Sequence, residues 1–292
     1  MMIVDIQYRS FEETLLACES LGGVDLIVTS PPYPDARPGQ YGGDASHDFT
    51  WPDYQRLGDH VARALKPGGF AAINIDGPVR TLRPEVGSER SLIAFKLAID
   101  WAERVGLRYV EHCAYVRLST PGRFDPRWRG GWEPLHIFQR PGARGYFDRW
   151  GATLERKTQN ANFSGAKRHG GRIVKFEGRT MRYNERRILT TAVECHVGSG
   201  STDTGHPASF SPVLADAFVL CYSPPGGIVC DPFMGSGTVA MSCARNGRNV
   251  IGGDLGARET DGRRWADIAT ERTMAIVDPA QKTLWSEHGV AS

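Results

Sequence analysis

The chain has 292 residues, 40% of them hydrophobic and 23% charged, which allows one large domain or one domain with an insert. Its six cysteines are scattered, without the spacing of a zinc site or the pattern of a disulfide framework. We find no secretory signal pattern and no apolar run long enough to span a bilayer, so we expect a cytoplasmic protein without a membrane partner.

The net charge of +2 conceals an uneven distribution along the chain. The segment 117–194 holds 17 Lys and Arg residues against 7 Asp and Glu residues, which leaves 18 basic and 26 acidic residues elsewhere. This asymmetry predicts a basic segment set into a mildly acidic body.

The chain alternates between helical and strand-like patterns up to about Arg117, and one more strand follows. We expect strands at 2–8, 24–28, 70–75, 107–116 and 133–138, and helices at 10–20, 51–65 and 91–105. Ser10 and Glu13 form a capping box that opens the first helix, and Lys66-Pro67-Gly68-Gly69 is expected to end the second. Residues 34–50, rich in Pro, Gly, Asp and Ser, predict a mobile loop or lid. The alternation predicts an α/β sheet with crossover helices.

Residues 141–200 interrupt this pattern with a Gly-, Arg- and Asn-rich stretch that contains interleaved aromatic residues. Basic side chains can contact phosphates and flat rings can contact bases, although a solvated insertion is the alternative. Regular structure then resumes, with a helix at 209–221, a strand at 228–231, a helix that ends at Asn246 and a strand at 249–254.

The strand at 24–28 leads into Thr29-Ser30-Pro31-Pro32-Tyr33. Each proline fixes its own backbone and lacks an N–H group, so the Pro31 carbonyl is available as a rigid acceptor. Ser30 supplies a second acceptor and Tyr33 a flat face for stacking. These groups suit a planar heterocycle that carries an exocyclic amino group. The alternative for the motif alone is a simple chain turn.

A glycine turn follows the strand at 228–231 and reads Asp231-Pro232-Phe233-Met234-Gly235-Ser236-Gly237-Thr238. Gly235 and Gly237 allow a ligand to approach the backbone closely, and the helix that follows presents free N–H groups. Asp254 closes the next strand, where a carboxylate can accept hydrogen bonds from ribose hydroxyls. The spacing matches neither GxGxxG nor GxxxxGK[ST]. Phe233 either packs on the ligand or belongs to the core, and His206 lies either at the site or at a helix start.

Taken together, the two motifs resemble those of the S-adenosylmethionine-dependent DNA amino-methyltransferases, in the β-class, whose catalytic motif precedes the cofactor motif. Leu65-Lys66-Pro67-Gly68-Gly69, His206-Pro207-Ala208 and Glu133–Phe138 also match elements of this family. The resemblance implies a Rossmann-like methyltransferase fold with a circularly permuted motif order, a mixed, mostly parallel sheet and a basic target-recognition insert. It divides the chain into a catalytic half (1–140), the insert (141–200) and a cofactor-binding half (201–292).

The resemblance also implies roles for individual residues. The catalytic set is Ser30, Pro31, Pro32 and Tyr33, and the cofactor-binding set is Asp231, Pro232, Phe233, Gly235, Ser236, Gly237, Thr238 and Asp254, with no metal. In this family Ser-Pro-Pro-Tyr is typical of cytosine-N4 enzymes and Asp-Pro-Pro-Tyr of adenine-N6 enzymes. The implied reaction is direct methyl transfer from S-adenosyl-L-methionine to N4 of a flipped cytosine.

The implied partner is double-stranded DNA. The resemblance also implies a role in restriction-modification, in which a cognate restriction endonuclease and a homodimer are possible further partners. Arg9-Ser10-Phe11 stands where the family usually has an acid near the cofactor adenine, so the residue that contacts the adenine is left open. Three alternatives remain: adenine-N6 methylation, a catalytically idle DNA-binding remnant, and an RNA or protein amine as substrate.

Overall fold

The computed structural model describes residues 2–33, 49–77, 79–81, 88–117, 130–155, 160–169, 172–182, 186–195, 205–206 and 210–278. Nearly all of the predicted loop at 34–50 lies outside these ranges. Within them, no helix is both long enough and apolar enough to cross a membrane.

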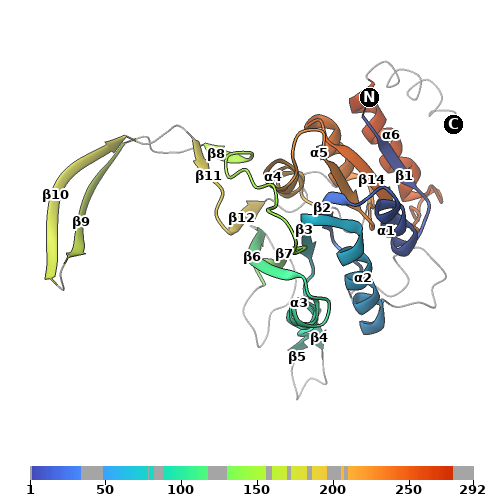
Figure 1. The fold of residues 1–292 in the computed structure, drawn as a ribbon, viewed down its shortest axis with the longest axis horizontal. Helices are drawn as coiled ribbons and strands as arrows, with labels where there is room; N and C mark the ends of the chain where they lie inside the picture. The colour runs from blue at the N-terminus through green and yellow to red at the C-terminus, as the bar shows by residue number, and fades with distance from the viewer. Residues whose placement is uncertain are drawn as a thin grey trace.

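A central eight-stranded sheet organises the molecule (Figure 1). Its strands, from one edge to the other, are β1 (Val4–Gln7), β14 (Asn249–Gly253), β13 (Ile228–Asp231), β2 (Val24–Thr29), β3 (Leu65–Asn74), β7 (Trp132–Gln139), β6 (Arg108–Arg117) and β12 (Ala192–Cys195). Strand β7 runs antiparallel to both of its neighbours, and the other pairs are parallel. The predicted mixed, mostly parallel sheet is confirmed.

Helices cover both faces of the sheet and enclose two hydrophobic cores. The first core packs under α1 (Phe11–Ser20), α2 (Trp51–Ala64) and α3 (Ile93–Glu103). The second packs under α4 (Pro212–Tyr222), α5 (Thr238–Arg245) and α6 (Trp265–Val277). A strand between two such layers is buried on both faces, which explains the continuous apolar run of β2. Its Ile27 enters the first core, whereas Leu26 and Val28 enter the second.

Two element boundaries differ from the sequence-based expectation. Strand β3 begins at Leu65 and includes the expected turn 66–69, because the pairing with β2 shifts register between Val24 and Leu26 and absorbs the extra residues. Helix α3 begins at Ile93 rather than Ser91, since the Ser91 hydroxyl accepts a hydrogen bond from the Ile93 N–H ahead of the first turn.

The sequence places Trp265 at a helical core position but does not give the bounds of helix α6, although Trp265, Ile268 and Ala269 repeat at helical spacing and are buried. Its amphipathic pattern was the signal that could have found it.

The basic segment contains more regular structure than its composition predicts. Strands β9 (Asn160–His169) and β10 (Arg172–Arg182) form an antiparallel hairpin, and Figure 1 shows this hairpin standing well apart from the body. Strands β8 (Thr153–Glu155) and β11 (Arg186–Ile188) pair at its base. Strand β12, also within 141–200, returns to the main sheet beside β6. A further hairpin joins β4 (Val79–Thr81) to β5 (Ser88–Arg90).

Candidate active site

The two motifs singled out in the sequence end on neighbouring parallel strands. Strand β2 pairs with β13, with Leu26 opposite Val229 and Ile27 opposite Cys230, so their carboxyl ends meet at one edge of the sheet. There the Thr29 hydroxyl donates a 2.6 Å hydrogen bond to Asp231 Oδ1, across 202 residues of sequence. Ligands of α/β sheets bind outside such carboxyl ends, so this edge is the candidate site.

Asp231 joins the glycine turn to the end of β2. Its Oδ1 accepts from the Phe233 N–H at 3.1 Å as well as from the Thr29 hydroxyl, and the side chain is buried. Burial raises the pKa of Asp231 to about 7, and the Asp254 charge adds to this rise while the two hydrogen bonds oppose it. Asp231 therefore acts on the site chiefly by fixing the backbone around it.

The glycine turn is shaped by positive backbone angles and by one carboxylate. Gly235 and Gly237 have φ values of +52° and +87°, a region that favours glycine. A Cβ at Gly237 would also lie 2.8 Å from Ala269 of α6. Asp254 Oδ2 accepts from the Gly235 N–H at 2.7 Å, and Oδ1 accepts from the Gly256 N–H at 2.7 Å. Each oxygen keeps a second lone pair with which it can accept a ligand hydroxyl.

Aromatic rings pack beside this turn. The Phe233 ring is half-buried and stacks on Phe11, with ring centroids 5.6 Å apart, and meets Phe49 edge-on at 5.5 Å. The His206 ring packs edge-on against Trp265 at 4.5 Å, and a Cβ on Gly235 would lie 2.9 Å from its Nε2. His206 thus lies at the turn, one of the two placements left open by the sequence.

The Tyr33 hydroxyl is the centre of a polar cluster at the end of β2. It lies 3.1 Å from Glu133 Oε2 and 3.2 Å from Asn74 Oδ1, and it accepts a 3.4 Å hydrogen bond from the Ser30 hydroxyl. Burial, followed by the Glu133 charge, raises the pKa of Tyr33 well above its usual value, so the hydroxyl stays protonated. Among the described residues, no hydrogen bond ends on the Pro31 carbonyl, which leaves it available as an acceptor.

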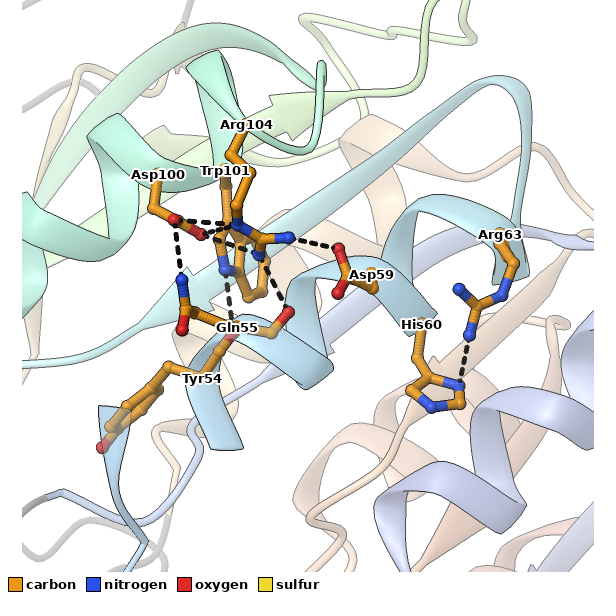
Figure 2. Close-up of polar contacts among 8 residues, drawn as sticks. All are labelled: Tyr54, Gln55, Asp59, His60, Arg63, Asp100, Trp101 and Arg104. Carbon is orange, nitrogen blue, oxygen red and sulfur yellow. Dashed lines mark hydrogen bonds and ion pairs between the residues drawn. The ribbon is translucent and has the colours of Figure 1, made fainter. Parts of the chain in front are cut away.

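Helix α2 holds the catalytic motif from the other side through Tyr54, whose hydroxyl donates to the Pro32 carbonyl. Tyr54 is itself fixed by α3, because Trp101 Nε1 donates to the Tyr54 carbonyl at 3.1 Å (Figure 2). A Cβ on Gly58 would lie only 2.5 Å from Trp101 Nε1, so the indole fits only because residue 58 is glycine.

Arg104, the residue that caps the carboxyl end of α3, reinforces the same contact between the two helices. Its guanidinium donates to Asp100 at 2.8 Å, to Asp59 at 2.6 Å and to the Gln55 carbonyl at 3.0 Å (Figure 2). We call the set of contacts made by Trp101 and Arg104 with α2 the α2–α3 clamp. It sets the position from which Tyr54 reaches the catalytic motif.

Comparison with known proteins decides the family. The profile of a family described as DNA methylase, comprising N6 and N4 enzymes, matches residues 24–261. The chain belongs to the N6/N4 DNA methylase family. The match includes both motifs and the basic segment between them.

Individual relatives agree with this assignment of the methylase. The chain is 28% identical over 260 residues to the orphan methyltransferase M.BamHII of Bacillus amyloliquefaciens, covering 85% of this chain and 88% of that protein. The crystal structure of the M1.HpyAVI–SAM complex superposes with a TM-score of 0.58 at 19% identity, over 92% of this chain and 98% of that one.

The cytosine-N4-specific PvuII DNA methyltransferase superposes with a TM-score of 0.56 at 15% identity, over 94% of this chain and 91% of that one. The Rossmann-like methyltransferase fold is therefore confirmed for this methylase.

Several residues of the methylase site were not singled out by sequence reasoning. Asn74 and Tyr54 carried no local signal, because each reaches the catalytic motif from another element. Glu133 is expected only as the start of a strand, yet it is a buried acid, which is an unusual placement.

Proposed function

We propose that this methylase transfers a methyl group from S-adenosyl-L-methionine to the exocyclic N4 of cytosine in double-stranded DNA. The observation that carries the proposal is the Thr29–Asp231 hydrogen bond, which holds the Ser30 motif and the glycine turn on adjoining strands. A methyl donor bound at the turn and an amino group bound at Ser30 would then share one edge of the sheet.

The residues of the glycine turn fit the proposed cofactor. The backbone at Gly235 and Gly237 allows close approach, the first turn of α5 presents N–H groups, and Asp254 can accept from ribose hydroxyls. The cofactor-binding set is Asp231, Pro232, Phe233, Gly235, Ser236, Gly237, Thr238 and Asp254, with Asp231 acting through the backbone. When bound, the cofactor supplies an electrophilic methyl group on its sulfonium.

The catalytic residues act by positioning and by oriented dipoles. Ser30 Oγ and the Pro31 carbonyl accept hydrogen bonds from the amino group, which draws the nitrogen lone pair out of the ring plane. With its lone pair held in this way, the amino nitrogen would face the methyl group that the cofactor supplies, and the thioether would be the leaving group. The methylated nitrogen releases one proton to solvent. Pro32 holds the loop rigid, and the Tyr33 ring stacks on the base.

The DNA reaches this site as a flipped base, at a cost of roughly a few kcal/mol, because the amino group is not accessible inside the duplex. The insert 141–200 holds the backbone and reads sequence, and the β9–β10 hairpin is its projecting part. The segments 1–140 and 201–292 form the catalytic and cofactor-binding halves. A cytoplasmic location, a homodimer and a cognate restriction endonuclease are part of the same proposal.

Ser30 is the feature that favours cytosine N4 over adenine N6, since an aspartate is typical of the adenine enzymes. Adenine-N6 methylation is the second candidate, because the family comprises both reactions. The fold is common to both and does not separate them.

Nucleoside mass spectrometry tests the proposal. Purified protein is incubated with S-adenosyl-L-methionine and unmodified plasmid DNA, beside the Ser30→Ala variant, and the DNA is digested to nucleosides. We expect N4-methylcytosine, with turnover falling in the variant by roughly 100-fold and DNA affinity preserved. N6-methyladenine would correct the base, and an equal loss of turnover and DNA binding in the variant would contradict the role of Ser30.

A further inference from the structure

The Tyr33 hydroxyl stands among more hydrogen-bond acceptors than it can serve. Its single proton faces Glu133 Oε2 at 3.1 Å and Asn74 Oδ1 at 3.2 Å. The Asn74 amide is oriented by its Nδ2, which donates to the Pro134 carbonyl at 3.2 Å, so Oδ1 is the atom that faces the phenol. The Tyr33 hydroxyl therefore directs its proton toward Asn74 of β3 and Glu133 of β7.

The direction of the Tyr33 proton fixes the direction of the hydrogen bond between Ser30 and Tyr33. With its proton directed to Glu133 and Asn74, the Tyr33 oxygen can meet the Ser30 hydroxyl only as an acceptor, across 3.4 Å. The Ser30 proton then points at Tyr33, and both Ser30 lone pairs face away from it. A serine hydroxyl that lacked this partner could rotate and present its proton instead.

We infer that Tyr33, held by Glu133 and Asn74, is a positioning residue that keeps the Ser30 hydroxyl in its acceptor orientation toward the target amino group. The inference rests on the proposed function, because it presupposes that Ser30 accepts from that group. It assigns Tyr33 a task beyond stacking, and it gives positioning roles to two residues from outside the catalytic motif.

Asn74 and Glu133 stand on two hydrogen-bonded neighbouring strands of the central sheet, which suits such a role. Asn74 is the last residue of β3, and Glu133 lies in β7. The next residue of β7, Pro134, accepts a hydrogen bond through its carbonyl from the Ile75 N–H at 3.3 Å. Both side chains are buried. A chain of donors running from Ser30 through Tyr33 to a carboxylate also polarises each hydroxyl, which makes Ser30 Oγ a stronger acceptor.

The test measures Tyr33→Phe in two backgrounds, by single-turnover methyl transfer to DNA that carries the target site. Phenylalanine keeps the ring and removes the hydroxyl. We expect the rate to fall roughly three- to tenfold when Ser30 is present, with the KM for DNA and the Kd for cofactor unchanged. In the Ser30→Ala background the same change has no further effect, since the tyrosine acts through Ser30. Glu133→Gln is expected to lower the rate less than Tyr33→Phe.

Two control variants carry the same chemical changes away from the site. Tyr109→Phe removes a hydroxyl that contacts His136 Nδ1 at 3.0 Å, and Glu111→Gln neutralises an exposed carboxylate on β6. Both should methylate at the wild-type rate. An equal loss from Tyr33→Phe in both backgrounds, or no loss with Ser30 present, would overturn the inference. Failure of the proposed function shows itself separately, as no methylated cytosine from the wild-type chain.

Discussion

At the scale of single residues, Asp231 is a carboxyl group removed from water, with hydrogen bonds from the Thr29 hydroxyl and the Phe233 N–H. Asp231 is buried, and its pKa of about 7 lies well above the value near 3.9 of an unfolded chain. Between these values the folded protein keeps a proton that the unfolded protein has released. The free energy of unfolding therefore falls as the pH rises from about 4 to about 7.

Asp231→Asn should remove this contribution to the pH dependence. Its amide oxygen can still accept from Thr29 and from the Phe233 N–H, but it does not titrate. Between about pH 4 and pH 7, the free energy of unfolding of the variant should rise relative to that of the wild type by up to about 1.4 kcal/mol per pH unit. Urea unfolding at pH 5 and pH 8 measures this difference. Asp267→Asn, an exposed change on α6, should follow the wild type. An equal change in the free energy of unfolding of Asp231→Asn and of the wild type between pH 5 and pH 8 would contradict the prediction.

At the scale of elements, the catalytic motif is held by helices that do not belong to it. The α2–α3 clamp fixes Tyr54, and Tyr54 contacts the Pro32 carbonyl. Gly58 leaves no room for a larger residue at this contact, because a Cβ there would clash with the fully buried Trp101 ring. Buried rings relax little, so overpacking at this position is costly.

Gly58→Ala should therefore lower the free energy of unfolding by about 1–3 kcal/mol, despite the better helix propensity of alanine. The motif should also be misplaced, so methylation should fall more than cofactor binding. Denaturant unfolding and calorimetry measure the two effects. Gly131→Ala is the matched control, since a Cβ there meets no described atom within 4 Å, and it should be neutral. Equal stability of the two variants would remove the steric argument.

At the scale of the whole molecule, the β9–β10 hairpin forms a sheet of its own, separate from the eight-stranded sheet. Its segment 160–182 contains six Lys and Arg residues against one Glu. An arm of this charge attracts phosphates, and its strands pair with each other rather than with the central sheet. The hairpin should therefore be separable from the fold.

Replacing residues 160–182 by a short Gly–Ser linker should leave thermal unfolding and cofactor affinity unchanged. DNA affinity should fall roughly tenfold or more, and its dependence on salt should become shallower, by about 0.9 in log–log slope for each phosphate that the protein no longer neutralises. Fluorescence anisotropy with labelled duplex DNA across a salt series measures both. Full DNA affinity in the shortened protein would assign DNA binding to another surface.

Much of the fold could be predicted because its signals are local. The capping box at Ser10, the apolar run of β2 and the glycine turn each depend on neighbours within a few residues. The strands of the insert were missed because Gly and Arg obscure strand alternation, and their pairing is decided across the hairpin. Within the site, Ser30 and Gly235 could be found from their motifs.

The sequence by itself determined the order of the two motifs, the residues Ser30-Pro31-Pro32-Tyr33 that follow β2, and the acid Asp254 that follows β14. These are properties of short segments, whose chemistry does not depend on distant contacts. Only the tertiary structure decided which distant residues complete the site. Glu133 and Tyr54 reach it because strand order and helix packing place them there, and such long-range placement leaves no mark in the residues beside them.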